Sequence, residues 1–213
     1  MLVKHAKDVA RQWVIEEASQ VVGFRGAFFH GSTNWLPDDA SVPATSDVDV
    51  MVVLEGPDLP DKPGKHIYQG MIIEASYLPG DQILSADQVL GVSHLAGSLQ
   101  AASVIIDPSG QLAKLQAAVS KDYAKRRWVY KRCEHARSKV MMHLQGLSES
   151  DPFHDQVTHW LFATGVTTHV LLVAGLKNPT VRTRYMAVRE LLADYGLSDF
   201  YNTLLEMLKS ESP

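Results

Sequence analysis

FFHGS (residues 28–32) and SDVDVMVVL (residues 46–54) are the stretches on which the predicted fold depends. Each contains an apolar run rich in Phe or Val, which is typical of a buried strand. Side chains two residues apart on a strand point to the same face, so Asp47 and Asp49 should project side by side from the second run. Two carboxylates held this close repel each other. Their pairing therefore indicates a shared proton or a divalent cation.

The segment around this pair is acidic and contains no Lys or Arg between residues 37 and 61. A salt-bridge interpretation would therefore need cations from far away in the chain, and the sequence favours a metal. Seven acids lie in the segment: Asp38, Asp39, Asp47, Asp49, Glu55, Asp58 and Asp61.

Gly31 and Ser32 follow the first apolar run and have the properties of a phosphate-binding turn. Glycine allows the backbone to approach a ligand closely, while backbone N–H groups and the serine hydroxyl can donate hydrogen bonds. A helix that begins here would add a partial positive charge. We expect these two residues to contact the phosphates of a nucleotide.

Together the Gly-Ser pair, the spacer and the Asp-Val-Asp strand resemble the signature of the DNA polymerase beta-like nucleotidyltransferase superfamily, over residues 24 to about 120. The layout is most similar to that of bacterial antibiotic (aminoglycoside) nucleotidyltransferases. The resemblance implies a small mixed sheet with helices on one side. It also implies transfer of a nucleoside monophosphate, AMP from ATP, to a hydroxyl with release of pyrophosphate. The spacer between Ser32 and Asp47 is longer than in compact members, so the expected short helix after Gly-Ser could be broken or replaced by a loop.

Glu74 is the single charge in the apolar stretch MIIEASYL (residues 71–78), where an isolated carboxylate is costly without a partner. The resemblance places it beside Asp47 and Asp49 and implies that the three carboxylates hold two Mg²⁺ ions. Glu74 would bind the second metal or accept the proton of the attacking hydroxyl, and the sequence leaves both roles open. The alternative is an edge strand with Glu74 facing water.

Composition and charge bound the remaining possibilities. The chain has 213 residues, of which 46% are hydrophobic, and a formal net charge of -4, so broad binding of nucleic acid is not expected. One cysteine, Cys133, excludes an internal disulfide and, with no signal peptide at the start, predicts a cytoplasmic protein. Asp107, before Pro108, is predicted to form a turn rather than to act in the site.

We predict an α+β fold with two domains: a nucleotidyltransferase-type catalytic domain at residues 1–120 and a helical substrate-binding domain at residues 121–213. The composition shifts at Lys121, after which eight of the twenty basic residues fall within 19 positions. Arg127 and Lys131 lie one helical turn apart and are candidates to bind the triphosphate, although a solvated helix face is the simpler explanation. They are accompanied by Lys121, Lys125, Arg126, Arg132, Arg137 and Lys139.

Residues 156–176 carry no Asp, Glu, Lys or Arg and would be long enough to span a membrane. Their threonines, histidines and glutamine instead predict the buried central helix of a bundle, and we expect no membrane partner.

The expected acceptor is a small hydroxylated molecule such as an aminoglycoside, which would make the chain an antibiotic-resistance enzyme. Three alternatives stay open: an antitoxin-type enzyme that adenylylates a protein, a nucleotide-binding or interaction protein without turnover, and a purely structural cation site. The sequence does not decide whether the chain forms a homodimer.

Overall fold

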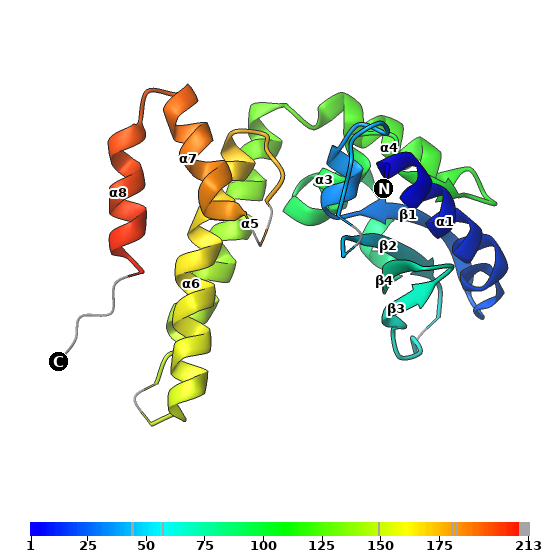
Figure 1. Cartoon of the computed structure of the whole chain (residues 1–213), viewed down its shortest axis with the longest axis horizontal. Helices are drawn as coiled ribbons and strands as arrows, with labels where there is room; N and C mark the ends of the chain where they lie inside the picture. The colour runs from blue at the N-terminus through cyan, green and yellow to red at the C-terminus, as the bar shows by residue number, and fades with distance from the viewer. Residues whose placement is uncertain (44, 57, 149, 180, 182, 209–213) are drawn as a thin grey trace. The chain divides into compact units, whose positions relative to one another are not determined.

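The computed structural model describes residues 1–208 except 44, 57, 149, 180 and 182. The chain divides into two units (Figure 1). The first comprises Met1–Leu90 and His94–Tyr123, and the second comprises Gly91–Ser93 and the chain from Ala124 onward. The division falls close to the position at which the composition shifts. Residues 209–213, the end of the predicted helical domain, lie outside the described residues.

The first unit is built on a five-stranded mixed sheet with the strand order β3-β4-β2-β1-β5. The central strands β2 and β4 are parallel, whereas the other neighbouring pairs are antiparallel. With its flanking helices this sheet confirms the predicted α+β class. The strand bounds are β1 Phe24–His30, β2 Asp47–Leu54, β3 Gly64–Tyr68, β4 Met71–Pro79 and β5 Val104–Ile106.

Helix α1 (Val3–Glu16) covers one face of this sheet, because its apolar stripe meets the inward-facing residues of the strands. Trp13 and Val14 of α1 join Val48, Val50 and Ile73 in one buried cluster. Burying a side chain of this size contributes about 1.5–3 kcal/mol. Side chains alternate along β2, so packing Val48 and Val50 against α1 turns Asp47 and Asp49 to the opposite face.

Short elements connect the strands and complete the first unit. The hairpin between β3 and β4 turns through Gln69 and Gly70, which both have positive φ, 46° and 78°, as a two-residue hairpin turn requires. The remaining elements are η1 Ala18–Gln20, η2 Ser32–Trp35, η3 Gly80–Ile83, α2 Ala86–Leu90, α3 Ser93–Leu99 and α4 Gln111–Asp122.

Strand β1 contains a β-bulge at Arg25. Phe24 pairs with Leu54 of β2 and Gly26 with Val53, so Arg25 has no counterpart of its own in this pair of strands. Gly26 follows with φ of 154°. A Cβ atom at this position would lie 2.6 Å from the backbone oxygen of Ile106 and 2.6 Å from Leu112 Cδ1. The close approach of β5 and α4 to β1 therefore requires glycine.

The second unit is helical, and its elements contact one another in chain order. Helix α5 spans Arg126–Gln145, α6 Phe153–Ala174, α7 Arg184–Asp194 and α8 Ser198–Glu206. A cluster of aliphatic side chains from α6, α7 and α8 forms its core, made of Leu172, Val188, Leu191, Leu192 and Leu204.

Helix α6 is less buried than the buried central helix of a bundle that the sequence predicts. Its buried residues all lie between Ala163 and Val173, whereas Phe153 is 80% exposed and Phe162 51% exposed. Helix α7 contacts α6 near its middle, where Tyr185 donates a hydrogen bond to the backbone oxygen of Thr164. Among the described residues, α6 is the one helix whose length and hydropathy would permit a membrane span, with 39% of its most apolar window buried.

Substituting Gly26 tests the close contact between β1 and β5. Gly26→Ala should lower the free energy of unfolding by about 3 kcal/mol, because the new Cβ collides with a backbone oxygen that cannot move aside. Gly70→Ala is the matched control: its φ is also positive, but no atom lies within 4 Å of the added Cβ. That control should lose only about 1 kcal/mol, the cost of the backbone conformation. Urea unfolding of both variants measures the difference, and equal losses would contradict it.

Candidate metal centre

Four polar side chains form a row across the sheet. Lys65 on β3 pairs in register with Glu74 on β4, Glu74 with Asp49 on β2, and Asp49 with His30 on β1. Residues paired in this way project to the same face of a sheet. Asp47 precedes Asp49 by two positions on β2 and shares that face. Strand register therefore brings residues from four strands to one place.

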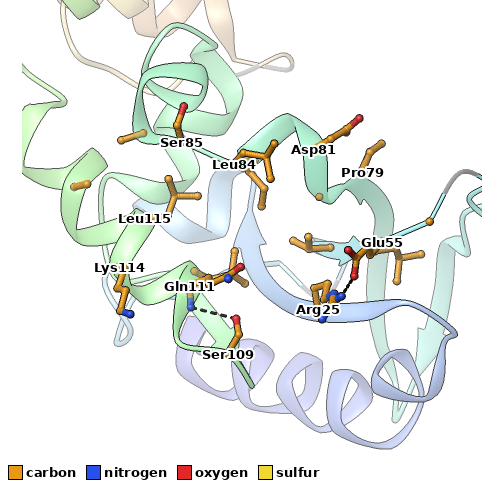
Figure 2. A pocket seen from close by; sticks show the side chains of 18 residues that line it. Arg25, Glu55, Pro79, Asp81, Leu84, Ser85, Ser109, Gln111, Lys114 and Leu115 are labelled. Carbon is orange, nitrogen blue, oxygen red and sulfur yellow. Dashed lines mark hydrogen bonds and ion pairs between the residues drawn. The ribbon is translucent and has the colours of Figure 1, made fainter.

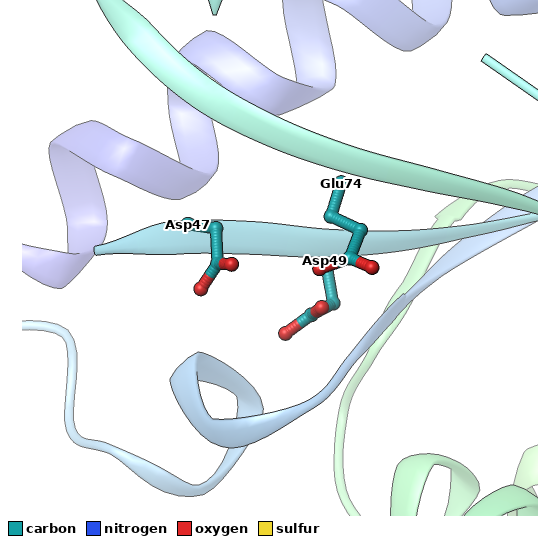
Figure 3. A group of neighbouring side chains, drawn as sticks. All are labelled: Asp47, Asp49 and Glu74. Atoms are coloured by element: carbon teal, nitrogen blue, oxygen red, sulfur yellow. The ribbon is translucent and has the colours of Figure 1, made fainter. Parts of the chain in front are cut away.

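The carboxylates of Asp47, Asp49 and Glu74 form a compact cluster. Each offers an oxygen that lies within 4.8 Å of those of the other two, and Figure 3 shows Glu74 beside Asp49. The side chains are partly shielded: that of Asp47 is 14% exposed and that of Glu74 36%. A donor set made only of carboxylate oxygens suits Mg²⁺, Mn²⁺ or Ca²⁺ rather than Zn²⁺ or copper. The cluster thus fits the metal that the resemblance implies.

Glu74 does not lie on an edge strand. Strand β4 is flanked by β3 on one side and by β2 on the other, and its pairing with β2 places Glu74 directly opposite Asp49. The edge-strand part of the alternative interpretation is therefore wrong, although the side chain of Glu74 is 36% exposed.

Lys65 also belongs to the cluster, which corrects the expectation that cationic partners would have to come from far away. Its Nζ donates a hydrogen bond to the carboxylate of Asp47 and lies 3.2 Å from Glu74 Oε2. The hydrogen bond with Asp47, followed by that with Glu74, raises the pKa of Lys65, so the ammonium is charged at neutral pH. Counting back from the turn at Gln69 and Gly70 would have placed Lys65 opposite Glu74.

The backbone of Gly31 lies directly against the side chain of Asp49. It has φ of 67°, and an added Cβ atom would fall 1.8 Å from Asp49 Oδ2. The chain then enters η2, whose first residue, Ser32, is exposed. The expected short helix after Gly-Ser is therefore present as a single 3₁₀ turn, followed by a loop that Val3 holds through a 2.9 Å hydrogen bond to the oxygen of Ala40. Gly31 and Ser32 lie where a ligand at the carboxylates could reach them.

His30 is a site neighbour that the sequence reasoning missed. Its Nδ1 lies 2.6 Å from Ser98 Oγ, and Ser98 donates its hydroxyl proton to the backbone oxygen of His94 at 3.0 Å. The direction of the hydrogen bond between His30 and Ser98 depends on which ring nitrogen of His30 carries the proton. Burial lowers the pKa of His30, and the negative charge of Glu74 opposes this shift. The position of His30 directly before Gly31 in the sequence could have indicated that it lies near the site.

Arg127 and Lys131 lie in the second unit, on helix α5. Both cations lie over the ring of Trp128, at 5.0 Å and 4.6 Å from its centre, and Trp128 is buried. These cation–π contacts give both residues a structural role on the helix. Their binding of a triphosphate stays a prediction.

Asp107 acts as the sequence predicts, in a turn and away from the cluster. Its Oδ2 accepts a 2.8 Å hydrogen bond from the backbone N–H of Ala113, and its Oδ1 accepts one from the hydroxyl of Ser109. It therefore satisfies a backbone donor in the first turn of α4.

A hollow of about 820 Å³ opens at the other end of β1 and β2, away from the carboxylates (Figure 2). The bulge at Arg25 directs its guanidinium to an ion pair with Glu55, and both side chains line the hollow. Apolar side chains such as Leu54 and Leu112 contribute to its walls. None of the cluster residues lines it, so the hollow and the candidate metal centre are separate features.

Comparisons with known proteins assign no activity to this chain. No protein-family model matches the chain, and no curated protein matches it. A solved structure of a nucleotidyltransferase-like protein from Exiguobacterium sibiricum 255-15 aligns with 97% of this chain and 68% of its own, at 15% identity and a TM-score of 0.44. A likeness of this extent says nothing about activity.

Gly31→Ala should impair cation binding while leaving the fold intact. The added Cβ would force the carboxylate of Asp49 to move, and a side-chain end moves at less cost than backbone. We expect a loss of Mn²⁺ affinity of at least about tenfold in calorimetric titration. The control is Gly110→Ala, where φ is 71° and no atom lies within 4 Å of the new Cβ. Unchanged Mn²⁺ affinity in Gly31→Ala would contradict the assignment of Asp49 as a ligand.

His30 should make the stability of the protein depend on pH. Burial lowers its pKa in the folded chain below the value near 6.5 of the unfolded chain. The unfolded chain therefore binds more protons in this range, so the free energy of unfolding should fall as the pH drops through about 6.5. His30→Gln should reduce this slope. Urea unfolding between about pH 7.5 and 5 measures it, and an identical slope in the variant would refute the role of His30.

Proposed function

We propose that the chain is a Mg²⁺-dependent nucleotidyltransferase that moves AMP from ATP to a hydroxyl of a small acceptor and releases pyrophosphate. One observation carries the proposal: Asp47, Asp49 and Glu74 converge from two adjacent parallel strands, and Asp49 lies against Gly31, the residue before Ser32. A carboxylate cluster next to a glycine-containing turn supports binding of a phosphate–metal complex. The polymerase beta-like resemblance of the same residues supports the reaction type.

Each residue of the cluster has a defined task in this proposal. Asp47 and Asp49 would hold two Mg²⁺ ions, which would neutralise charge on the phosphates and lower the pKa of the attacking hydroxyl. Gly31 offers its backbone and Ser32 its exposed hydroxyl to the β- and γ-phosphates. Glu74 completes the cation site or accepts the hydroxyl proton, and its 36% exposed side chain is accessible enough for either.

The acceptor we propose is an aminoglycoside-like antibiotic or a related polyhydroxylated molecule. The acidic composition around the cluster would favour a cationic acceptor of this kind. Phosphate oxygens that the metals do not neutralise require Lys or Arg, and Arg127 and Lys131 are candidates for this role by residue type alone.

Asp49→Asn provides the direct test of this function. Calorimetric titration of ATP, GTP, CTP and UTP with Mg²⁺ should show binding to the wild type, with ATP preferred. The variant loses a charged ligand, so its binding should collapse, and pyrophosphate release with an aminoglycoside panel should fall at least about 100-fold. Asp58→Asn is the control, because Asp58 is an exposed acid of the same segment and should change neither measurement.

Two results would overturn the proposal. Absence of nucleotide binding by the wild type would favour a structural ion cluster, for which the contacts of Lys65 with Asp47 and Glu74 already provide a cation. Nucleotide binding without turnover on any small acceptor would favour an enzyme that modifies a protein, or a nucleotide-binding protein without catalysis. Mass spectrometry of co-purified partners, searched for an added AMP, separates these two.

A further inference from the structure

Lys65 occupies the position that a cation at the carboxylate cluster would need. Its ammonium contacts both Asp47 and Glu74, and these two carboxylates belong to the group whose oxygens lie within 4.8 Å of one another. An ammonium hydrogen-bonded to these oxygens uses the lone pairs that a divalent cation would coordinate. Lys65 and a metal therefore compete for the same carboxylate groups.

The charges of the cluster determine how strongly Lys65 lowers the affinity for a divalent cation. Three carboxylates carry three negative charges, and Lys65 neutralises one of them. A divalent cation that arrives while Lys65 stays in place meets a smaller attraction and an additional repulsion from the ammonium. Because these groups lie only a few ångströms apart, the electrostatic effect on cation affinity is large.

The position of Lys65 on β3 allows its ammonium to move. Strand β3 is at one edge of the sheet, and the side chain of Lys65 is 48% exposed. Its flexible four-carbon stem lets the ammonium reach neighbouring sites without moving the backbone. A triphosphate at Gly31, which adjoins Asp49, and at the following Ser32 would offer phosphate oxygens as new partners.

We infer that Lys65 is a built-in counter-ion of the cluster that couples metal binding to nucleotide binding. Without nucleotide, its ammonium keeps the affinity of the cluster for a divalent cation low. A bound triphosphate draws the ammonium away from Asp47 and Glu74 and so raises that affinity. Coupling of this kind is reciprocal, so the metal strengthens nucleotide binding by the same factor. The nucleotide half of this inference rests on the proposed function, whereas the competition with metal does not.

Mn²⁺ binding provides a test that needs no turnover. Electron paramagnetic resonance counts free Mn²⁺ in titrations of the wild type and of Lys65→Met, with and without the non-hydrolysable probe α,β-methylene ATP. Lys65→Met should bind Mn²⁺ alone at least about tenfold more tightly than the wild type. The probe should tighten Mn²⁺ binding strongly in the wild type and at least about threefold less in the variant.

Two controls separate charge from shape and from nonspecific effects. Lys65→Arg keeps the cation and should bind Mn²⁺ within about threefold of the wild type. Lys62→Met removes an exposed cation three positions away and should leave Mn²⁺ binding unchanged. Urea unfolding of each variant verifies that the sheet is intact.

The outcomes distinguish this inference from the proposed function. Equal or weaker Mn²⁺ binding in Lys65→Met overturns the counter-ion role, whatever the nucleotide does. Tighter Mn²⁺ binding in that variant, together with no binding of the nucleotide probe to any of the proteins, supports the competition with metal and refutes the coupling and the nucleotidyltransferase function. Equal tightening by the probe in both proteins also refutes the coupling.

Discussion

The parallel pairing of β2 with β4 is the constraint on which the candidate site depends. It places Asp49 opposite Glu74, and the hairpin to β3 then places Lys65 in the same row. Because side chains alternate along a strand, a slip of one residue would turn Glu74 to the face covered by α1. The apolar neighbours of Glu74, Ile73 and Ala75, are buried on that face and hold the register. The packing of the core thus positions the polar row on the other side of the sheet.

Much of the sheet was predictable because its signals are local. The apolar runs of β1, β2 and β4 stand out by composition, and the alternation along β2 predicts that Asp47 and Asp49 share a face. The proximity of Glu74 came from a family resemblance rather than from its own segment. The turn formed by Asp107 was also predictable, since Asp before Pro favours this geometry by itself.

The features that escaped prediction depend on contacts between distant segments. His30 meets Ser98, which is 68 positions later in the chain, and no local pattern reports such a contact. To predict that Lys65 lies opposite Glu74, one needs the register of the hairpin between β3 and β4 as well as its existence. Helix α6 shows the same limit: no charged residue follows Asp155 along it, and the burial of its residues between Ala163 and Val173 depends on contacts with α5 and α7 that its own sequence does not report. The hydrophobic periodicity of a segment describes that one element, whereas its burial also depends on the elements that pack against it.

The place of Lys65 at the sheet edge has a consequence for association as well as for chemistry. An edge strand exposes unpaired N–H and C=O groups that can template the strand of another molecule, and proteins commonly protect such edges by keeping them short and by placing Lys there. Strand β3 is five residues long and bears Lys65 and, two positions later, Ile67, which is 75% exposed. The ammonium of Lys65 that pairs with the carboxylates thereby also opposes the pairing of β3 with a strand of another molecule. Replacing Lys65 should therefore affect both the carboxylate cluster and the tendency of the protein to aggregate.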